Sequence, residues 1–110
     1  MSYPVERSYY RINYPLTERP MLVLEGRQYP VIDCSEHGLR FVRSLSVPLE
    51  VGDRVQGLLK FRRGAEADVE GDVVRVQADH AALHLKVAGI PLSIILDEQR
   101  YLRVHYPMRF

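Results

Sequence analysis

Six short runs that are rich in apolar residues, several of them alternating apolar with polar residues, constrain this chain more than any other feature, and most of the connections between them contain glycine or proline. Alternation with a period of two is typical of β-strands that bury one face. Leu39 and Phe41 should face the core in one run, and Leu83, Leu85 and Val87 in another. We therefore expect strands at residues 21–25, 28–32, 39–43, 54–61, 67–77 and 80–87.

Two glycines predict departures from regular strands. Gly26-Arg27 is expected to form the tight connection of a hairpin between the first two strands. Gly71, inside the fifth run, predicts a bulge or a sharp bend. Bends of that kind help an antiparallel sheet to curl into a barrel.

The period changes near the C-terminus, after Pro91, a residue type that favours the first turn of a helix. Spacings of three and four residues, typical of a helix, separate Leu92, Ile95, Leu96, Gln99 and Leu102. One helix of three or four turns is expected. Many short strands followed by a single helix fit a small antiparallel barrel that the helix covers at one side or end.

Length, charge and cysteine content limit the class of protein. The 110 residues fit one domain. Lysine and arginine number 15 against 14 acidic residues, a net charge of +1, which gives no general attraction to a nucleic acid polymer or an anionic membrane. No apolar run approaches the roughly 20 residues of a membrane span, so we expect no membrane insertion. A single cysteine and the absence of a signal sequence predict a cytoplasmic protein.

Two polar motifs carry the functional signal. Arg7 and Arg11 stand four positions apart near the N-terminus, and guanidinium groups bind phosphate bidentately and stack on bases. Asp33, Ser35 and Gly38 lie between the second and third predicted strands, where Gly38 is expected to supply backbone freedom. Taken alone, the first motif is also compatible with a solvated basic arm, and the second with an ordinary hairpin connection.

An Arg-x-x-x-Arg motif followed about twenty residues later by Asp-x-Ser-x-x-Gly resembles the PilZ domain family, and the resemblance covers nearly the whole chain. It implies a bacterial receptor for cyclic di-GMP, built as a six-stranded antiparallel PilZ-type β-barrel with a flexible N-terminal arm and a C-terminal α-helix. We therefore expect residues 1–19 to form the flexible arm that carries the arginine motif. Residues 20–110 should form the barrel and its C-terminal helix.

The resemblance implies a ligand-binding role for each motif residue. Arg7 and Arg11 would bind the phosphates of cyclic di-GMP and contact or stack on guanine. Asp33 would accept hydrogen bonds from the guanine N1 and N2 donors, and Ser35 would contact a phosphate or a base edge. Gly38 would let the nucleotide approach the backbone.

Two further positions bear on ligand binding. Arg75 is a provisional site residue, because PilZ domains often place tryptophan or arginine against guanine near this strand position, and the chain has no tryptophan. The alternative is an arginine that simply faces solvent. Glu6 stands where many members of the family carry an additional arginine, which leaves one or two bound ligands per chain open.

The sequence shows no pattern of an enzyme. Cys34 is expected to be a half-buried strand cysteine without a catalytic role. The histidines lack the spacing of a zinc site, and no Ser-His-Asp order or glycine-rich phosphate loop is present; they are His37, His80, His84 and His105. We expect no catalytic residue, no metal and no cofactor, with cyclic di-GMP as the ligand.

The predicted function is that of a non-enzymatic receptor or adaptor. Its N-terminal arm would close over cyclic di-GMP and change a surface that binds an unidentified protein partner, and so regulate motility, biofilm formation or virulence. One alternative is a PilZ-fold interaction module that acts without nucleotide. Another is a small barrel that binds single-stranded nucleic acid, which the near-neutral charge disfavours.

Overall fold

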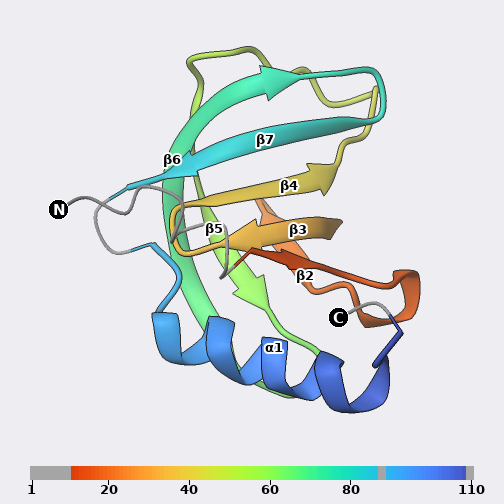
Figure 1. The fold of residues 1–110 in the computed structure, drawn as a ribbon. Coiled ribbons are helices and arrows are strands. Elements are labelled where there is room, and N and C mark those ends of the chain that lie inside the picture. Colours follow the sequence, from red (N-terminus) through yellow and green to blue (C-terminus); the bar gives the residue numbers. More distant parts are fainter. Residues whose placement is uncertain (1–10, 87–88, 109–110) are drawn as a thin grey trace, which may run out of the picture.

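The computed structural model describes residues 11–86 and 89–108, which form a closed six-stranded antiparallel β-barrel with one extra strand and an α-helix (Figure 1). This confirms the predicted fold class. The elements are β1 (Ile12–Asn13), the 3₁₀ helix η2 (Leu16–Glu18), β2 (Met21–Leu24), β3 (Arg27–Ser35), β4 (Gly38–Val42), β5 (Arg54–Lys60), β6 (Glu66–Val76), β7 (His80–Leu85) and α1 (Leu92–His105).

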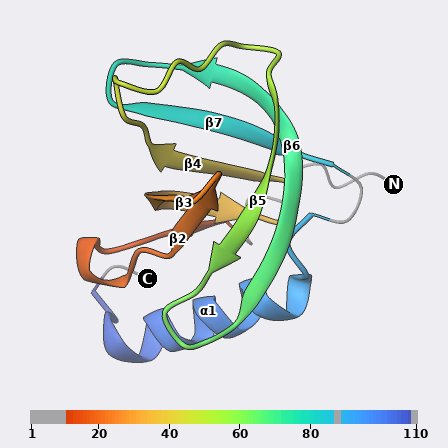
Figure 2. The same cartoon turned by 180° about the vertical axis from the view of Figure 1, so that it is seen from behind.

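The barrel closes through β3. Neighbouring strands follow the order β3, β2, β5, β6, β7 and β4, and β4 pairs back onto β3. The short β1 pairs antiparallel with β3, with Ile12 opposite Cys34 and Asn13 opposite Asp33. Figures 1 and 2 show the ring from opposite sides, with α1 lying across one end and the connection between β4 and β5 at the other. Among the described residues, no helix has the length and apolarity needed to cross a bilayer.

The core contains the apolar side chains that alternation along the strands points inward. Leu39, Phe41, Leu83 and Leu85 are each at most 2% exposed, as predicted. Val87, which we also expected in the core, lies outside the described residues. The helix contributes Ile95 and Leu102 to the core, two buried side chains on the same face. Their burial explains why α1 covers the end of the barrel.

The position of the hairpin turn needs correction, and so does one of the two alternatives for Gly71. The β2–β3 turn is centred on Glu25 and Gly26, whose φ angles of 49° and 81° give the type I′ geometry that matches the twist of a hairpin, so the turn lies one residue earlier than predicted. Gly71 is not bulged, although β6 does curve strongly along its length (Figure 1). A Cβ atom there would collide with the carbonyl oxygen of His84 on β7, so glycine permits a close approach of two strands. The irregularity of β6 lies at Val74 instead.

Several residues of the expected arm pack against the barrel. Ile12 and Tyr14 are buried, and the backbone amide of Tyr14 donates to the carbonyl oxygen of Ile32 at 3.1 Å. Leu16–Glu18 makes one turn of 3₁₀ helix. The core therefore contains side chains from both sides of the predicted boundary at residue 19.

A buried carboxylate, Glu98, anchors α1 to this N-terminal segment. The Tyr14 hydroxyl donates to Glu98 at 2.7 Å, and Arg63 donates to both carboxylate oxygens, from Nε at 3.0 Å and from Nη2 at 3.1 Å. Arg63 also donates to Glu18 at 3.0 Å. Burial, with the nearby Cys34 and Glu98, raises the pKa of Tyr14, so its hydroxyl stays protonated and remains a donor.

Candidate functional site

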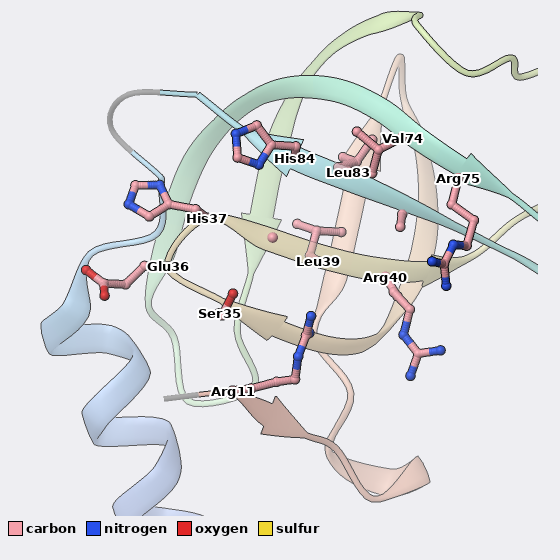
Figure 3. Close-up of a pocket in the computed structure, with 12 residues that line it drawn as sticks. Arg11, Ser35, Glu36, His37, Leu39, Arg40, Val74, Arg75, Leu83 and His84 are labelled. Carbon is pink, nitrogen blue, oxygen red and sulfur yellow. The ribbon is translucent and has the colours of Figure 1, made fainter. Parts of the chain in front are cut away.

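A cleft of about 640 Å³ lies on the outer face of the barrel, over β3, β4, β6 and β7 (Figure 3). Its volume falls within the range of roughly 300–1,000 Å³ that is usual for small-molecule sites. Residues of four segments of the chain line it: Arg11, Ser35, Glu36, His37, Gly38, Leu39, Arg40, Val74, Arg75, Ala82, Leu83 and His84. Four of the predicted site residues are in this set.

One bulge in β3 places the second motif on the cleft side of the sheet. Val31 pairs with Phe41 and Asp33 with Arg40, so Ile32 is an extra residue in β3. Strict alternation from the buried Val31 would point Asp33 and Ser35 into the core. The extra residue reverses the alternation, so that Cys34 enters the core while its two neighbours face outward.

Asp33 holds two arginines beside the cleft. Its Oδ1 accepts from Nη1 of Arg11 at 3.0 Å, and its Oδ2 accepts from both Nε, at 2.7 Å, and Nη2 of Arg40. Asp33 itself is 2% exposed, because these guanidinium groups cover it. The hydrogen bonds to Asp33 raise the pKa of Arg40, so this arginine is permanently charged. The predicted contact of Asp33 with a guanine edge stays a prediction.

A second bulge, in β6, brings Arg75 to the same face. Val73 pairs with Leu83 and Arg75 with Ala82, which leaves Val74 as the extra residue. Because Val73 points inward, strict alternation would have sent Arg75 inward as well. The bulge instead exposes both Val74 and Arg75 at the cleft. Arg75 is thus exposed to solvent and also lines the cleft, so its contact with a guanine stays a prediction.

Gly38 lines the cleft for a different reason from the one predicted. It begins β4 in ordinary strand conformation without a positive φ angle, so the expected need for backbone freedom is wrong. A Cβ atom there would lie 3.6 Å from the carbonyl oxygen of Leu83 and 3.7 Å from Oγ of Ser35. These are ordinary contact distances. The fold therefore does not require glycine at this position, and the absence of a side chain leaves the cleft deeper there.

The charges around the cleft suit an anion. Arg11, Arg40 and Arg75 supply three guanidinium groups, against the carboxylate of Glu36 in the lining and Asp33 behind it. In Figure 3 the three arginines lie toward one end of the cleft, while Glu36, His37 and His84 lie toward the other. Such a set can bind phosphate oxygens and the acceptor edge of a purine.

Sequence reasoning missed Arg40, although a signal was present. Glu36 and His37 form a two-residue turn, with Ser35 paired to Gly38. Counting back along both strands from that turn sets Asp33 opposite Arg40. A carboxylate opposite an arginine predicts a cross-strand ion pair. The missed residues of β7 carried no such signal, because the pairing of β4 with the distant β7 brings them to the cleft, and Val74 reaches it through the bulge in β6.

Other predicted features can be located as well. Arg7 and Glu6 lie outside the described residues. Cys34 is more deeply buried than the half-buried position that we expected, since it is fully covered, and burial raises its pKa to about 12. Among the residues that the structure describes, no group of three or more histidine, cysteine or acidic side chains could hold a metal ion.

Comparison with known families identifies the architecture. The family model of the PilZ domain matches residues 6–103, a span that begins before Arg7 and ends within α1. The chain belongs to the PilZ domain family. PilZ domains bind cyclic di-GMP or serve as adaptor modules, and the match indicates no catalytic family. A search of curated proteins found no match.

Proposed function

We propose that this PilZ domain is a cyclic di-GMP receptor and that the cleft over β3, β4, β6 and β7 holds the ligand. The observation that carries the proposal is the convergence of Arg11, Ser35, Gly38 and Arg75 on one cleft. These residues come from both motifs and from β6, and are up to 64 positions apart in the sequence (75 − 11). Asp33 supports the same cleft by holding Arg11.

The chemistry of the cleft matches the ligand. Cyclic di-GMP offers two phosphates and two guanine bases, so a receptor needs cations, hydrogen-bonding groups and flat surfaces for stacking. Arg11 and Arg75 supply guanidinium groups for phosphate or for the faces of the bases. Ser35 supplies a hydroxyl that both donates and accepts, and Gly38 leaves room for the nucleotide beside the backbone.

Closure of the N-terminal arm is the proposed switch. Arg7 would join Arg11 at the ligand, so that residues before Ile12 fold over the cleft. Ordering a segment costs about 1–2 kcal/mol per residue, which charge-assisted hydrogen bonds and stacking must offset. The closed arm would present a new surface to a protein partner in the bacterial cytoplasm, and so control motility, biofilm formation or virulence.

Calorimetric titration with cyclic di-GMP tests the proposal, with GTP and single-stranded DNA as controls. We expect saturable binding of the cyclic dinucleotide alone, and its stoichiometry would show whether one ligand or two bind. Arg11→Ala should weaken binding tenfold or more, because a hydrogen bond to a charged group contributes about 1.5–3 kcal/mol.

Arg54→Ala is the matched control. Arg54 is an exposed strand arginine with ion pairs of its own, at 3.6 Å to Glu70 and 3.5 Å to Asp72, and it belongs to β5, outside the four strands around the cleft. The Arg54→Ala variant should bind cyclic di-GMP as tightly as the wild type. Absence of cyclic di-GMP binding in the wild type would overturn the proposal in favour of an interaction module without nucleotide, and selective binding of DNA would favour the nucleic-acid barrel.

A further inference from the structure

Four residues form a row across four strands at one end of the cleft. Asp33 on β3 pairs with Arg40 on β4, Arg40 pairs with Ala82 on β7, and Ala82 pairs with Arg75 on β6. Because each pair is in register, the four side chains lie side by side on the outer face. The row depends on both bulges, since each one turns an end residue, Asp33 or Arg75, outward.

Arg40 is fixed in place and directed at the cleft. Its Nε and Nη2 atoms occupy one edge of the guanidinium group, and both donate to Oδ2 of Asp33. The remaining nitrogen, Nη1, therefore lies on the side away from that carboxylate oxygen. The side chain is 37% exposed, and it lines the cleft. A guanidinium that is already held loses little conformational freedom when it binds a ligand.

Ala82 creates a gap between two arginines. Neighbouring strands are about 4.8 Å apart, so the backbones at Arg40 and Arg75 are separated by roughly 10 Å with only a methyl group between them. A larger side chain on β7 would fill this gap. The arrangement leaves a slot with a small apolar floor and a guanidinium on each side, which is suited to a flat ring that carries hydrogen-bond acceptors.

We propose that Arg40, which belongs to neither motif, binds the ligand directly and forms with Arg75, across Ala82, a slot for one guanine base. Nη1 of Arg40 donates to the O6 and N7 acceptor edge of the base. Arg75 packs against the face of the base, and the methyl group of Ala82 supports it from below. Asp33 is then a positioning residue, which acts by aiming Arg11 and Arg40. The inference rests on the proposed function and specifies its ligand contacts.

Two variants test the slot by calorimetric titration with cyclic di-GMP. Arg40→Ala removes the donor, and we expect binding at least tenfold weaker. Ala82→Ile fills the floor without altering Asp33, Arg11 or Arg40, and we expect a similar loss. Isoleucine favours strands, and Ala82 lies on the outer face, so the barrel should remain folded. Arg54→Ala serves again as the control, with circular dichroism and chemical denaturation to verify folding.

The outcomes separate the inference from the proposed function. Weakened binding in Arg40→Ala and Ala82→Ile, with normal binding in Arg54→Ala, would support the slot. Normal binding in both cleft variants would overturn the slot while the receptor function stands. Loss in Arg40→Ala alone would overturn it too, because Arg40 would then act only through Asp33. A wild-type protein that does not bind would overturn the receptor function itself.

Discussion

Gly38 and Gly71 are both strand glycines, but a side chain at each would meet different surroundings. At Gly38 an added Cβ atom would make contacts of 3.6 and 3.7 Å, whereas at Gly71 it would collide with the backbone of β7. Both glycines lie in the sheet without a positive φ angle. The difference between them is therefore one of space, and it separates a glycine that serves the cleft from one that serves the fold.

This contrast gives a prediction at the scale of single residues. Gly38→Ala should leave the free energy of unfolding within about 1 kcal/mol of the wild type but should weaken binding of cyclic di-GMP, because the new methyl group raises the floor of the cleft. Gly71→Ala should cost about 1–3 kcal/mol, because β6 and β7 must move apart. Urea denaturation and calorimetric titration measure the two effects. Equal destabilisation by both substitutions would contradict the assignment.

The sequence predicted the chemistry of the site better than its geometry. Arg11, Ser35 and Gly38 were identified from spacing and residue type, and all three line the cleft. The bulges at Ile32 and Val74 could not be predicted, because nothing in the local composition marks either residue as an extra one. Gly71 attracted the prediction of a bulge or a bend because glycine commonly marks such sites. The bulge is absent there, and the glycine permits the close approach of a neighbouring strand.

At the scale of secondary-structure elements, α1 depends on an ion-pair network as well as on apolar packing. Glu98 lies between the buried Ile95 and Leu102 on the inner face of the helix. The sequence shows only a glutamate within a helical repeat, and its partners Tyr14 and Arg63 are distant in the chain. The helix could therefore be predicted from periodicity, but its anchor could not.

Removing Arg63 should destabilise the protein through this anchor. Arg63→Ala leaves the Glu98 carboxylate, whose side chain is 5% exposed, without its charged partner. Loss of one member of a buried pair typically costs about 3–5 kcal/mol. The side chain of Arg63 is itself 29% exposed, so its removal would let water reach Glu98, and we expect a cost of about 2–4 kcal/mol. Chemical denaturation measures the change in the free energy of unfolding.

Arg100→Ala is the matched control on the same helix. Arg100 pairs with Asp97 at 3.0 Å, but both side chains are more than 70% exposed. Exposed ion pairs contribute about 0–1 kcal/mol, so this variant should unfold close to the wild-type midpoint. A similar loss of stability in both variants would show that Arg63 contributes no more than a surface arginine.

The same network predicts a pH dependence. Partial burial would raise the pKa of Glu18, but the hydrogen bonds from Tyr106 and Arg63 outweigh it and hold the pKa below its ordinary value of 4.5. A carboxylate with a lowered folded-state pKa stabilises the fold above the ordinary value, and this contribution is lost as the pH falls through the folded-state pKa. The free energy of unfolding should therefore decline below about pH 4.5.

Glu18→Gln isolates this contribution. Other carboxylates also titrate in this range, so the test is the difference between the wild type and the variant, each measured by urea denaturation across the acid range. The stability advantage of the wild type should shrink as the pH falls. A difference that stays constant with pH would mean that protonation of Glu18 is not coupled to unfolding.

At the scale of the whole molecule, the cleft exists only when strands from distant parts of the chain have paired. Its lining comes from β3, β4, β7 and β6, which are neighbours in that order, and the pairing of β4 with β7 joins segments that are far apart in the sequence. Runs with strand periodicity and one segment with helical spacing were sufficient to predict six strands and one helix. The extra β1 was not predicted, since two residues are too few to show a period, and Ile12 and Tyr14 are recognised as core residues only by their burial.

Ligand binding should therefore stabilise the entire fold. Cyclic di-GMP at 100 times its dissociation constant should add about 2.7 kcal/mol to the free energy of unfolding. For a domain of this size, that corresponds to a rise of roughly 10 °C or more in the thermal midpoint. Calorimetric scanning with and without ligand measures the shift, and Arg11→Ala should show a smaller one at the same ligand concentration. Binding without any shift would contradict a cleft confined to the folded barrel.

The two bulges make the site more sensitive to insertions and deletions than to substitutions. Deleting one residue at Ile32 would restore strict alternation, so that Asp33 and Ser35 would enter the core and Cys34 would face water. A deletion at Val74 would likewise turn Arg75 inward. A substitution in the cleft alters one side chain, whereas an insertion or deletion in β3 or β6 would move several side chains between the core and the outer face at once.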